Sequence, residues 1–171
     1  AEKLNEEEDV ISAFHQLQDL HQQYREIGPV AKELREQIWE RFKAASTVIN
    51  KKHQQHFEDL RAKEEENLAK KTALCEKVEA ANQEEYKTAK DWEKVTQEII
   101  EIQKEWRTIG FAPQKMNVKI FERFRIANDE FFNKKAEFFK GLKDTYSANL
   151  EKKQQLVNKA KELADSTDWK K

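Results

Sequence analysis

The chain has 171 residues, and its 32 Lys and Arg against 33 Asp and Glu leave a formal net charge of −1, too small to attract nucleic acid or an anionic membrane through an overall field. Charged residues make up 38% of the chain and hydrophobic residues only 37%, and three Gly and two Pro leave little material for turns. This composition argues against strands, hairpins and β-sandwiches, and it favours an all-helical protein whose helices carry narrow apolar stripes.

A first helix is predicted over residues 9–27, after an acidic lead-in, residues 1–8, that is expected to be frayed. Its apolar residues are separated by steps of three and four, which places them on one helix face. Gly28-Pro29 is predicted to end the helix, because glycine suits the left-handed conformation of a helix end and proline cannot continue the hydrogen-bond ladder. The apolar residues of this face are Val10, Phe14, Leu17, Leu20, Tyr24 and Ile27.

A long second helix is predicted from near Lys32 to about Ala81, because neither Gly nor Pro interrupts it. Its apolar stripe thins around His53 and His56 and then resumes with a shifted phase. The two halves of this helix are therefore expected to pack against different partners. Residues 82–87 form the predicted linker that follows.

A third helix is predicted to start at Thr88, because Thr88 and Asp91 have the spacing of a capping box and an aromatic residue, Trp92, follows. It should end before Gly110. A second long helix, with its own apolar stripe, should then run to about Leu163.

Two motifs recur at a constant offset of 82 residues. Tyr24-Arg25-Glu26-Ile27-Gly28 returns as Trp106-Arg107-Thr108-Ile109-Gly110, and Trp39-Glu40-Arg41-Phe42 returns as Phe121-Glu122-Arg123-Phe124. Because each turn is short, each short helix is expected to fold back antiparallel on the first half of its long helix. The second half would then pair with the next short helix. The predicted fold is all-α, with tandem short-helix/long-helix repeats that form elongated three-helix bundles.

The repeat divides the chain into a first unit, residues 1–87, and a second unit, residues 88–164. Residues 165–171 repeat the start signal of the third helix, since Asp168-Trp169 matches Asp91-Trp92, and a third unit is predicted to begin there. The chain is therefore expected to be a monomeric piece of a longer repeat protein.

These motifs resemble the bacterial helical repeats of the family called domain of unknown function 349, and the likeness covers nearly the whole chain. The chain differs from the family pattern at Tyr24, where Trp is usual, and at residues 110–113, where Pro comes three residues after Gly. The resemblance implies tandem helical repeats in a bacterial cytoplasmic protein, and it implies no defined activity.

Several other features point to the cytoplasm and away from membranes. The single cysteine, Cys75, excludes an internal disulfide and fits a reducing compartment. No apolar run approaches the roughly 18 residues that a membrane span needs. The acidic start of the chain is typical neither of a signal peptide nor of a transit peptide.

The sequence offers little for catalysis or metal binding. His53 and His56 share a helix face, but the equivalent residues of the second repeat are Lys135 and Phe138, so a solvated patch is expected in place of a metal site. Cys75 corresponds to Val157 and is expected to be a small packed residue. No nucleophile, base and orienting group can be combined, so neither an enzyme nor a cofactor is predicted.

The repeated arginines, Arg25/Arg107 and Arg41/Arg123, stand beside repeated aromatic residues. In one interpretation they lie along the aromatic rings and pair with a glutamate of the helix. In the other they belong to a basic strip that binds phosphates. The aromatic residues of the second motif, Trp39, Phe42, Phe121 and Phe124, are predicted to lie in the core.

The leading functional hypothesis is a non-enzymatic helical-repeat scaffold that binds an unidentified protein partner. The alternative is weak binding of RNA or DNA through the basic face of the second repeat. Residues 115–143 carry an excess of four positive charges, whereas the equivalent residues 33–61 carry an excess of one, so the field is not repeated. The candidate interaction residues are Arg25, Arg107, Lys119, Arg125, Lys134 and Lys140.

Overall fold

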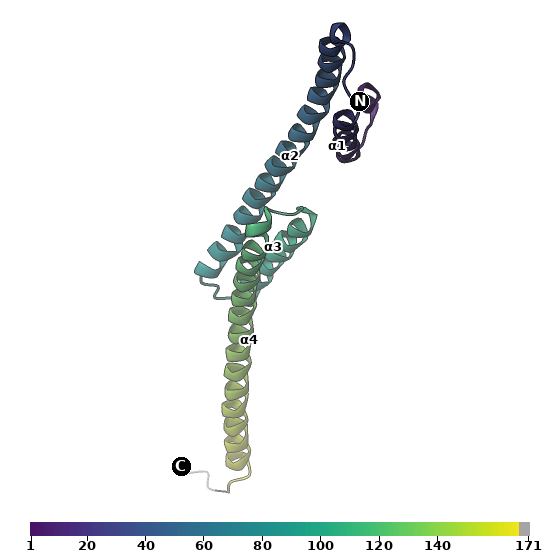
Figure 1. The fold of residues 1–171 in the computed structure, drawn as a ribbon. Helices are drawn as coiled ribbons and strands as arrows, with labels where there is room; N and C mark the ends of the chain where they lie inside the picture. The colour runs from purple at the N-terminus through teal and green to yellow at the C-terminus, as the bar shows by residue number, and fades with distance from the viewer. Residues whose placement is uncertain (168–171) are drawn as a thin grey trace. The chain divides into compact units, whose positions relative to one another are not determined.

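The computed structural model describes residues 1–167, and it confirms the all-α class (Figure 1). A short 3₁₀ helix η1 (Glu2–Glu6) precedes four α-helices, and no strand occurs among residues 1–167. The Asp168-Trp169 pair, on which the predicted third unit depends, lies outside the described residues. The helices are α1 (Val10–Glu26), α2 (Lys32–Gln83), α3 (Ala89–Thr108) and α4 (Gln114–Ala164).

The predicted start of α3 is confirmed in detail. The Thr88 hydroxyl accepts a hydrogen bond from the Asp91 amide at 3.1 Å, and the Asp91 carboxylate accepts one from the Thr88 amide at 3.2 Å. At the start of α1, Asp9 alone caps the helix. Its carboxylate accepts hydrogen bonds from the backbone amides of Ile11 and Ser12, both 3.0 Å long. Each cap satisfies amides that have no partner inside the helix.

The prediction that a left-handed glycine ends α1 is wrong. No glycine among residues 1–167 has a positive φ. Instead, α1 and α3 both end at an isoleucine with an extended backbone, at φ −71° and ψ 130° for Ile27 and φ −83° and ψ 131° for Ile109. A β-branched side chain favours this extended conformation. After α1, Pro29 also disfavours a helical conformation at Gly28.

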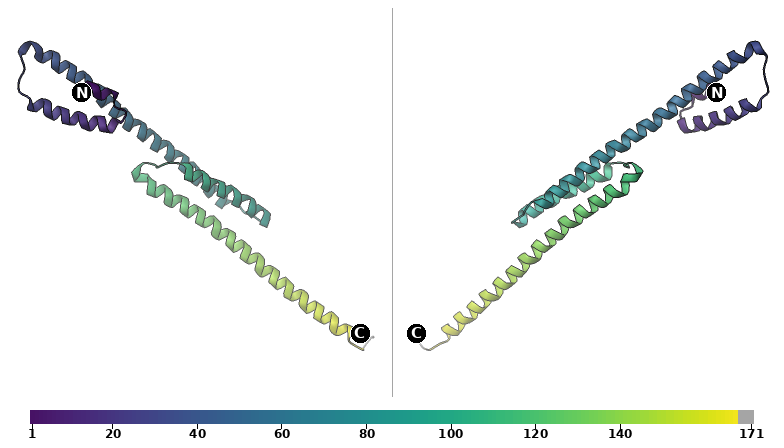
Figure 2. Two further views of the ribbon diagram at one scale, coloured as in Figure 1. Left: turned by 90° about the vertical axis from the view of Figure 1, so that its right-hand side faces the viewer. Right: turned by 60° about the vertical axis from the view of Figure 1, so that its left-hand side comes forward.

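The chain divides into two units, Ala1–Asn67 and Leu68–Lys171. In unit 1, α1 runs antiparallel to the first part of α2 (Figure 2). The Phe14 ring stacks on His53 with centroids 3.8 Å apart, and the Tyr24 ring stacks on Phe42 at 4.6 Å. The buried core residues of this unit are Ala13, Leu17 and Ile49, against which Ala1 and Leu4 also pack.

In unit 2, the last part of α2, the whole of α3 and the first part of α4 share one core. Helix α3 is antiparallel to α4, since Trp92 lies near Phe131, with centroids 5.5 Å apart, and Trp106 stacks on Phe124 at 4.0 Å. The last part of α2 is parallel to α4, because the contacts between them move toward the carboxyl ends of both helices together. In one of these contacts the Asn82 side-chain amide donates to the Ala127 carbonyl at 2.8 Å. The buried core consists of Leu74, Cys75, Val78, Trp92, Ile99, Ala112, Ile120, Phe124, Ala127 and Phe131.

The motif aromatics divide into two kinds, which corrects the prediction that all four are core residues. Phe124 is 7% exposed and Phe42 is half-buried, but Trp39 is 43% exposed and Phe121 is 52% exposed. Each exposed ring directly follows a stripe isoleucine, Ile38 or Ile120. One residue corresponds to about 100° around a helix axis, so both rings lie off the direction of the stripe isoleucine, and the Trp39 ring lies at the edge of the core, 5.7 Å from the Tyr24 ring.

We expect Phe124→Ala to destabilise unit 2 by about 3–5 kcal/mol, because it removes a buried ring and its stacking partner for Trp106. Phe121→Ala, the matched control three residues away, should cost less than about 1 kcal/mol. Native-state hydrogen exchange of α3 amides reports the stability of this unit by itself. Equal losses in the two variants would contradict the assignment of Phe124 to the core.

Candidate interaction surfaces

The second pair of repeated arginines makes structural ion pairs. Arg123 of α4 donates two hydrogen bonds to the Glu79 carboxylate of α2, each 2.8 Å long. Arg41 donates in the same way to Glu2 of η1, at 3.0 and 2.9 Å. The guanidinium hydrogen bonds, followed for Glu2 by the arginine's charge, hold the pKa of both carboxyl groups below its ordinary value. Arg41 and Arg123 therefore each pair with a glutamate of another helical element, and this pairing is the part of the first interpretation that these contacts support.

The first pair of repeated arginines lies elsewhere. Arg25, in the last turn of α1, is exposed and donates to the Gln22 side-chain carbonyl at 2.9 Å. Arg107 occupies the equivalent exposed position in the last turn of α3. Both cations are favourably placed at the carboxyl ends of their helices, where the helix dipole is negative.

The predicted basic residues of α4 are not gathered on one face. Arg125 and Lys134 are nine residues apart and so lie on about opposite sides of the helix. Arg125 pairs with Glu122 at 2.8 Å and Asp129 at 3.5 Å, while Lys134 pairs with Glu130 at 2.8 Å and donates to the Asn82 carbonyl at 2.7 Å. Lys119 and Lys140 are exposed at two further angles around the axis.

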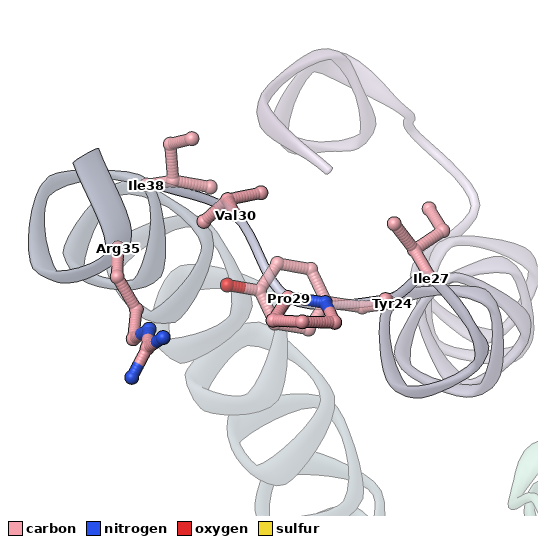
Figure 3. Close-up of a pocket in the computed structure, with 7 residues that line it drawn as sticks. Tyr24, Ile27, Pro29, Val30, Arg35 and Ile38 are labelled. Carbon is pink, nitrogen blue, oxygen red and sulfur yellow. The ribbon is translucent and has the colours of Figure 1, made fainter. Parts of the chain in front are cut away.

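An apolar hollow of about 440 Å³ opens in unit 1 between the end of α1 and the start of α2. Figure 3 shows the Tyr24 ring and Pro29 at its centre, with Val30 and Ile38 on one side and Ile27 on the other. The guanidinium of Arg35 lies at its edge. The hollow adjoins a second one that Ala1, Glu2 and Arg41 help to line.

A third surface is the second part of α4, where large apolar side chains are exposed. The same part of α2, which precedes it by 82 residues, packs its apolar side chains into or against the core of unit 2. The exposed residues of α4 are Tyr146, Leu150, Leu156, Val157 and Leu163.

The exposed motif aromatics, Trp39 and Phe121, are the surface feature that the sequence interpretation missed. Their positions are equivalent, at the 82-residue offset, and both rings are exposed in their own unit. In the sequence each ring directly follows an isoleucine of the apolar stripe, but the stripe alone does not show which of the two neighbours faces the core.

The histidines and the cysteine take part in packing. His53 stacks on Phe14 with its ring nearly parallel, at 17°. Within residues 1–167 no group of three or more His, Cys, Asp or Glu side chains is placed to hold a metal ion. Cys75 is fully buried, as the sequence predicts, and burial raises the pKa of its thiol to about 11. None of the helices described over residues 1–167 carries an apolar stretch long enough to cross a bilayer.

The helices define an all-α protein in which shorter and longer helices alternate. The family described as Domain of Unknown Function (DUF349) matches residues 37–115 and 119–171, and because these matches span well over half of the chain, the chain belongs to this family. The two matches begin 82 residues apart, so the family repeat and the motif offset coincide. No curated protein and no solved structure matches the chain.

We expect Cys75 to react with iodoacetamide at least about 100-fold more slowly in the native chain than in the urea-unfolded chain. A thiol pKa raised from 9.0 to about 11 reduces the reactive thiolate by about that factor at neutral pH, and burial slows access further. Mass spectrometry of the alkylated peptide gives the rate. Similar rates in the two states would show that the core around Cys75 is open.

The Glu79–Arg123 pair should make unit 2 sensitive to acid. Because the pKa of Glu79 is lower in the folded state, the stability that it contributes is present above its unfolded pKa of about 4.5 and is lost as pH falls through the folded value. Glu79→Gln should therefore destabilise unit 2 slightly at pH 7, and this difference should shrink as the pH falls below about 4.5. Hydrogen exchange of α3 amides over this range is the measurement, and a pH-independent difference would contradict the ion pair.

Proposed function

We propose that the chain is a non-enzymatic helical-repeat scaffold that binds other proteins, with Trp39 and Phe121 as its anchoring residues. The single observation that carries this proposal is that a large aromatic ring is exposed at the same position of both units. Exposed aromatic residues are enriched among the few side chains that dominate binding energy in protein interfaces. A ring on each unit would give a partner one point of attachment per unit.

Phe121 is the more informative of the two rings. In unit 2 three helices already share the core, and yet Phe121 remains 52% exposed. Packing within the repeat therefore does not explain why an aromatic residue stands there. The apolar residues of the second part of α4 add further surface of the kind on which amphipathic helices dock.

Nucleic-acid binding is the weaker candidate. The positive side chains of Arg125 and Lys134 are paired with carboxylates and lie on about opposite sides of α4. A phosphate backbone would contact only part of such a set at once. Binding of this kind would be weak and sensitive to salt.

Three observations support a non-enzymatic role in the cytoplasm. The only cysteine is buried with a raised pKa, so it is poorly suited to act as a nucleophile. A single thiol also fits a reducing compartment. The likeness of the motifs to bacterial repeats supports a bacterial cytoplasmic location.

Site-specific photocrosslinking with the full chain tests the scaffold proposal. A photoreactive amino acid at Arg125, one turn from Phe121, should capture a protein from a nuclease-treated lysate. The double variant Trp39→Ala and Phe121→Ala should reduce that capture at least about 30-fold, the effect of losing a strong interface residue, while the chain stays folded at the assay temperature by circular dichroism. Val118→Ala, which shortens another exposed side chain of α4, should leave capture unchanged.

Two results would contradict the scaffold proposal. Capture that the double variant does not reduce would exclude Trp39 and Phe121 as anchors. Crosslinks that appear only without nuclease, and that disappear at about 0.2 M salt, would favour the nucleic-acid alternative.

A further inference from the structure

The segment before α1, expected from the sequence to be frayed, is instead held in unit 1 by two specific contacts. Arg41 binds Glu2 through both carboxylate oxygens, and the Lys52 ammonium donates to the Asn5 carbonyl at 2.6 Å. In unit 2 the equivalent arginine and lysine make the same two contacts with residues at the end of α2. There Arg123 binds Glu79, and Lys134 donates to the Asn82 carbonyl at 2.7 Å.

The match between residues 1–5 and residues 78–82 extends to the other side chains. Both segments have glutamate and asparagine three residues apart. Ala1 and Leu4 pack on the core of unit 1, while Val78 and Ala81, at the corresponding positions, pack in or against the core of unit 2. Both asparagines bury an Oδ1 atom that has no hydrogen-bond partner among residues 1–167. Residues 1–5 thus occupy the place of the last turn of a third helix.

The rest of that third helix has no counterpart in unit 1. In unit 2, Ala112 and Ile120 are 2% and 4% exposed in the core that α2 shares through Leu74 and Cys75. Their equivalents in unit 1, Val30 and Ile38, are 40% and 38% exposed. These two side chains line the hollow of Figure 3, which is continuous with the surface around Ala1 and Glu2.

We propose that this face of unit 1 is the docking site of an amphipathic helix that leads directly into Ala1 and ends in residues 2–5. Its chemistry follows from the part of α2 that covers the equivalent face. Apolar side chains should stand where α2 has Leu68, Leu74 and Cys75. A lysine should stand in the place of Lys71, whose ammonium lies 5.1 Å from the Trp106 ring, and it would lie over Tyr24 in the same way.

A second copy of the chain is the other conceivable source of such a helix. The second part of its α4 has apolar residues at the same spacing, at Leu150, Leu156 and Val157. However, Lys161 of that helix would then stand where Glu79 stands, facing the like charge of Arg41. Its last turn would also have to displace residues 1–5 from their contacts with Arg41 and Lys52. A helix continuous with Ala1 avoids both costs.

The proposal can be tested by extending the full chain with a copy of residues 65–77 in front of Ala1, so that Ala1 takes the place of Val78. We expect hydrogen exchange of α1 amides to slow about tenfold or more, while exchange in α3 stays unchanged. The matched control is the same extension with the copies of Leu68→Gln, Leu74→Gln and Cys75→Gln. Glutamine keeps the helix propensity and removes the apolar contacts, so this control should give no slowing.

A second readout does not depend on exchange rates. In this readout Cys75 is replaced by Val, both in the chain and in its copy within the extension, and Ile38→Cys supplies the single thiol. This thiol should react with a maleimide about tenfold more slowly when the extension is present. Equal rates with and without the extension, or equal protection by the glutamine control, would overturn the proposal. Protection that grows with concentration in the unextended chain, and that Leu156→Asp abolishes, would assign the face to a second copy. Each of these outcomes leaves the scaffold proposal untouched, because it is measured at Trp39 and Phe121.

Discussion

In each unit, the aromatic residue at the end of the short helix stacks on a phenylalanine of the long helix. The ring planes of Trp106 and Phe124 are only 7° apart, and those of Tyr24 and Phe42 are 20° apart. The stack lies immediately before the turn, and so it fixes the point at which the long helix begins its return. In unit 2 the antiparallel register of α3 on α4 is consistent with this contact, since Trp92, at the other end of α3, lies beside Phe131 and Phe138. The smaller Tyr24 takes the place in unit 1 that Trp106 has in unit 2, without loss of the stack.

The arginine of the second motif contributes ion pairs between elements, whereas the aromatic rings around it contribute packing. Arg41 and Arg123 each form an ion pair with a glutamate from an earlier segment of the chain. Lys52 and Lys134 each donate a hydrogen bond to the backbone carbonyl of the residue three positions after that glutamate. These four contacts are polar and directional, so they set the register of one helix against the next. Exposed ion pairs contribute little stability, and both side chains of each pair are more than one third exposed. Register is therefore a better explanation of their repetition than stability is.

Helix class and extent could be predicted from the sequence because they depend on local signals. The capping box at Thr88, the stop before Gly110 and the absence of breakers in α2 and α4 placed every helix end within a few residues. Apart from the left-handed glycine expected after α1, the predictions that failed depend on orientation or on long-range contacts. The apolar stripe alone does not show that the Trp39 and Phe121 side chains lie off the buried face of their helices. The buried face must be known first. The contact of Glu2 with Arg41 joins residues 39 apart, which no local pattern reveals.

The candidate surfaces were harder to predict, because exposure depends on what a neighbouring element covers. Leu74 and Leu156 are equivalent in sequence, yet one is buried and the other is exposed. Likewise Ile38 and Ile120 have the same local pattern, and only the second lies in a core shared by three helices. In a repeat protein the stability of each unit includes the interface with its neighbour. The same apolar stripe is therefore buried where an adjacent helix packs on it and exposed where none of the described residues does.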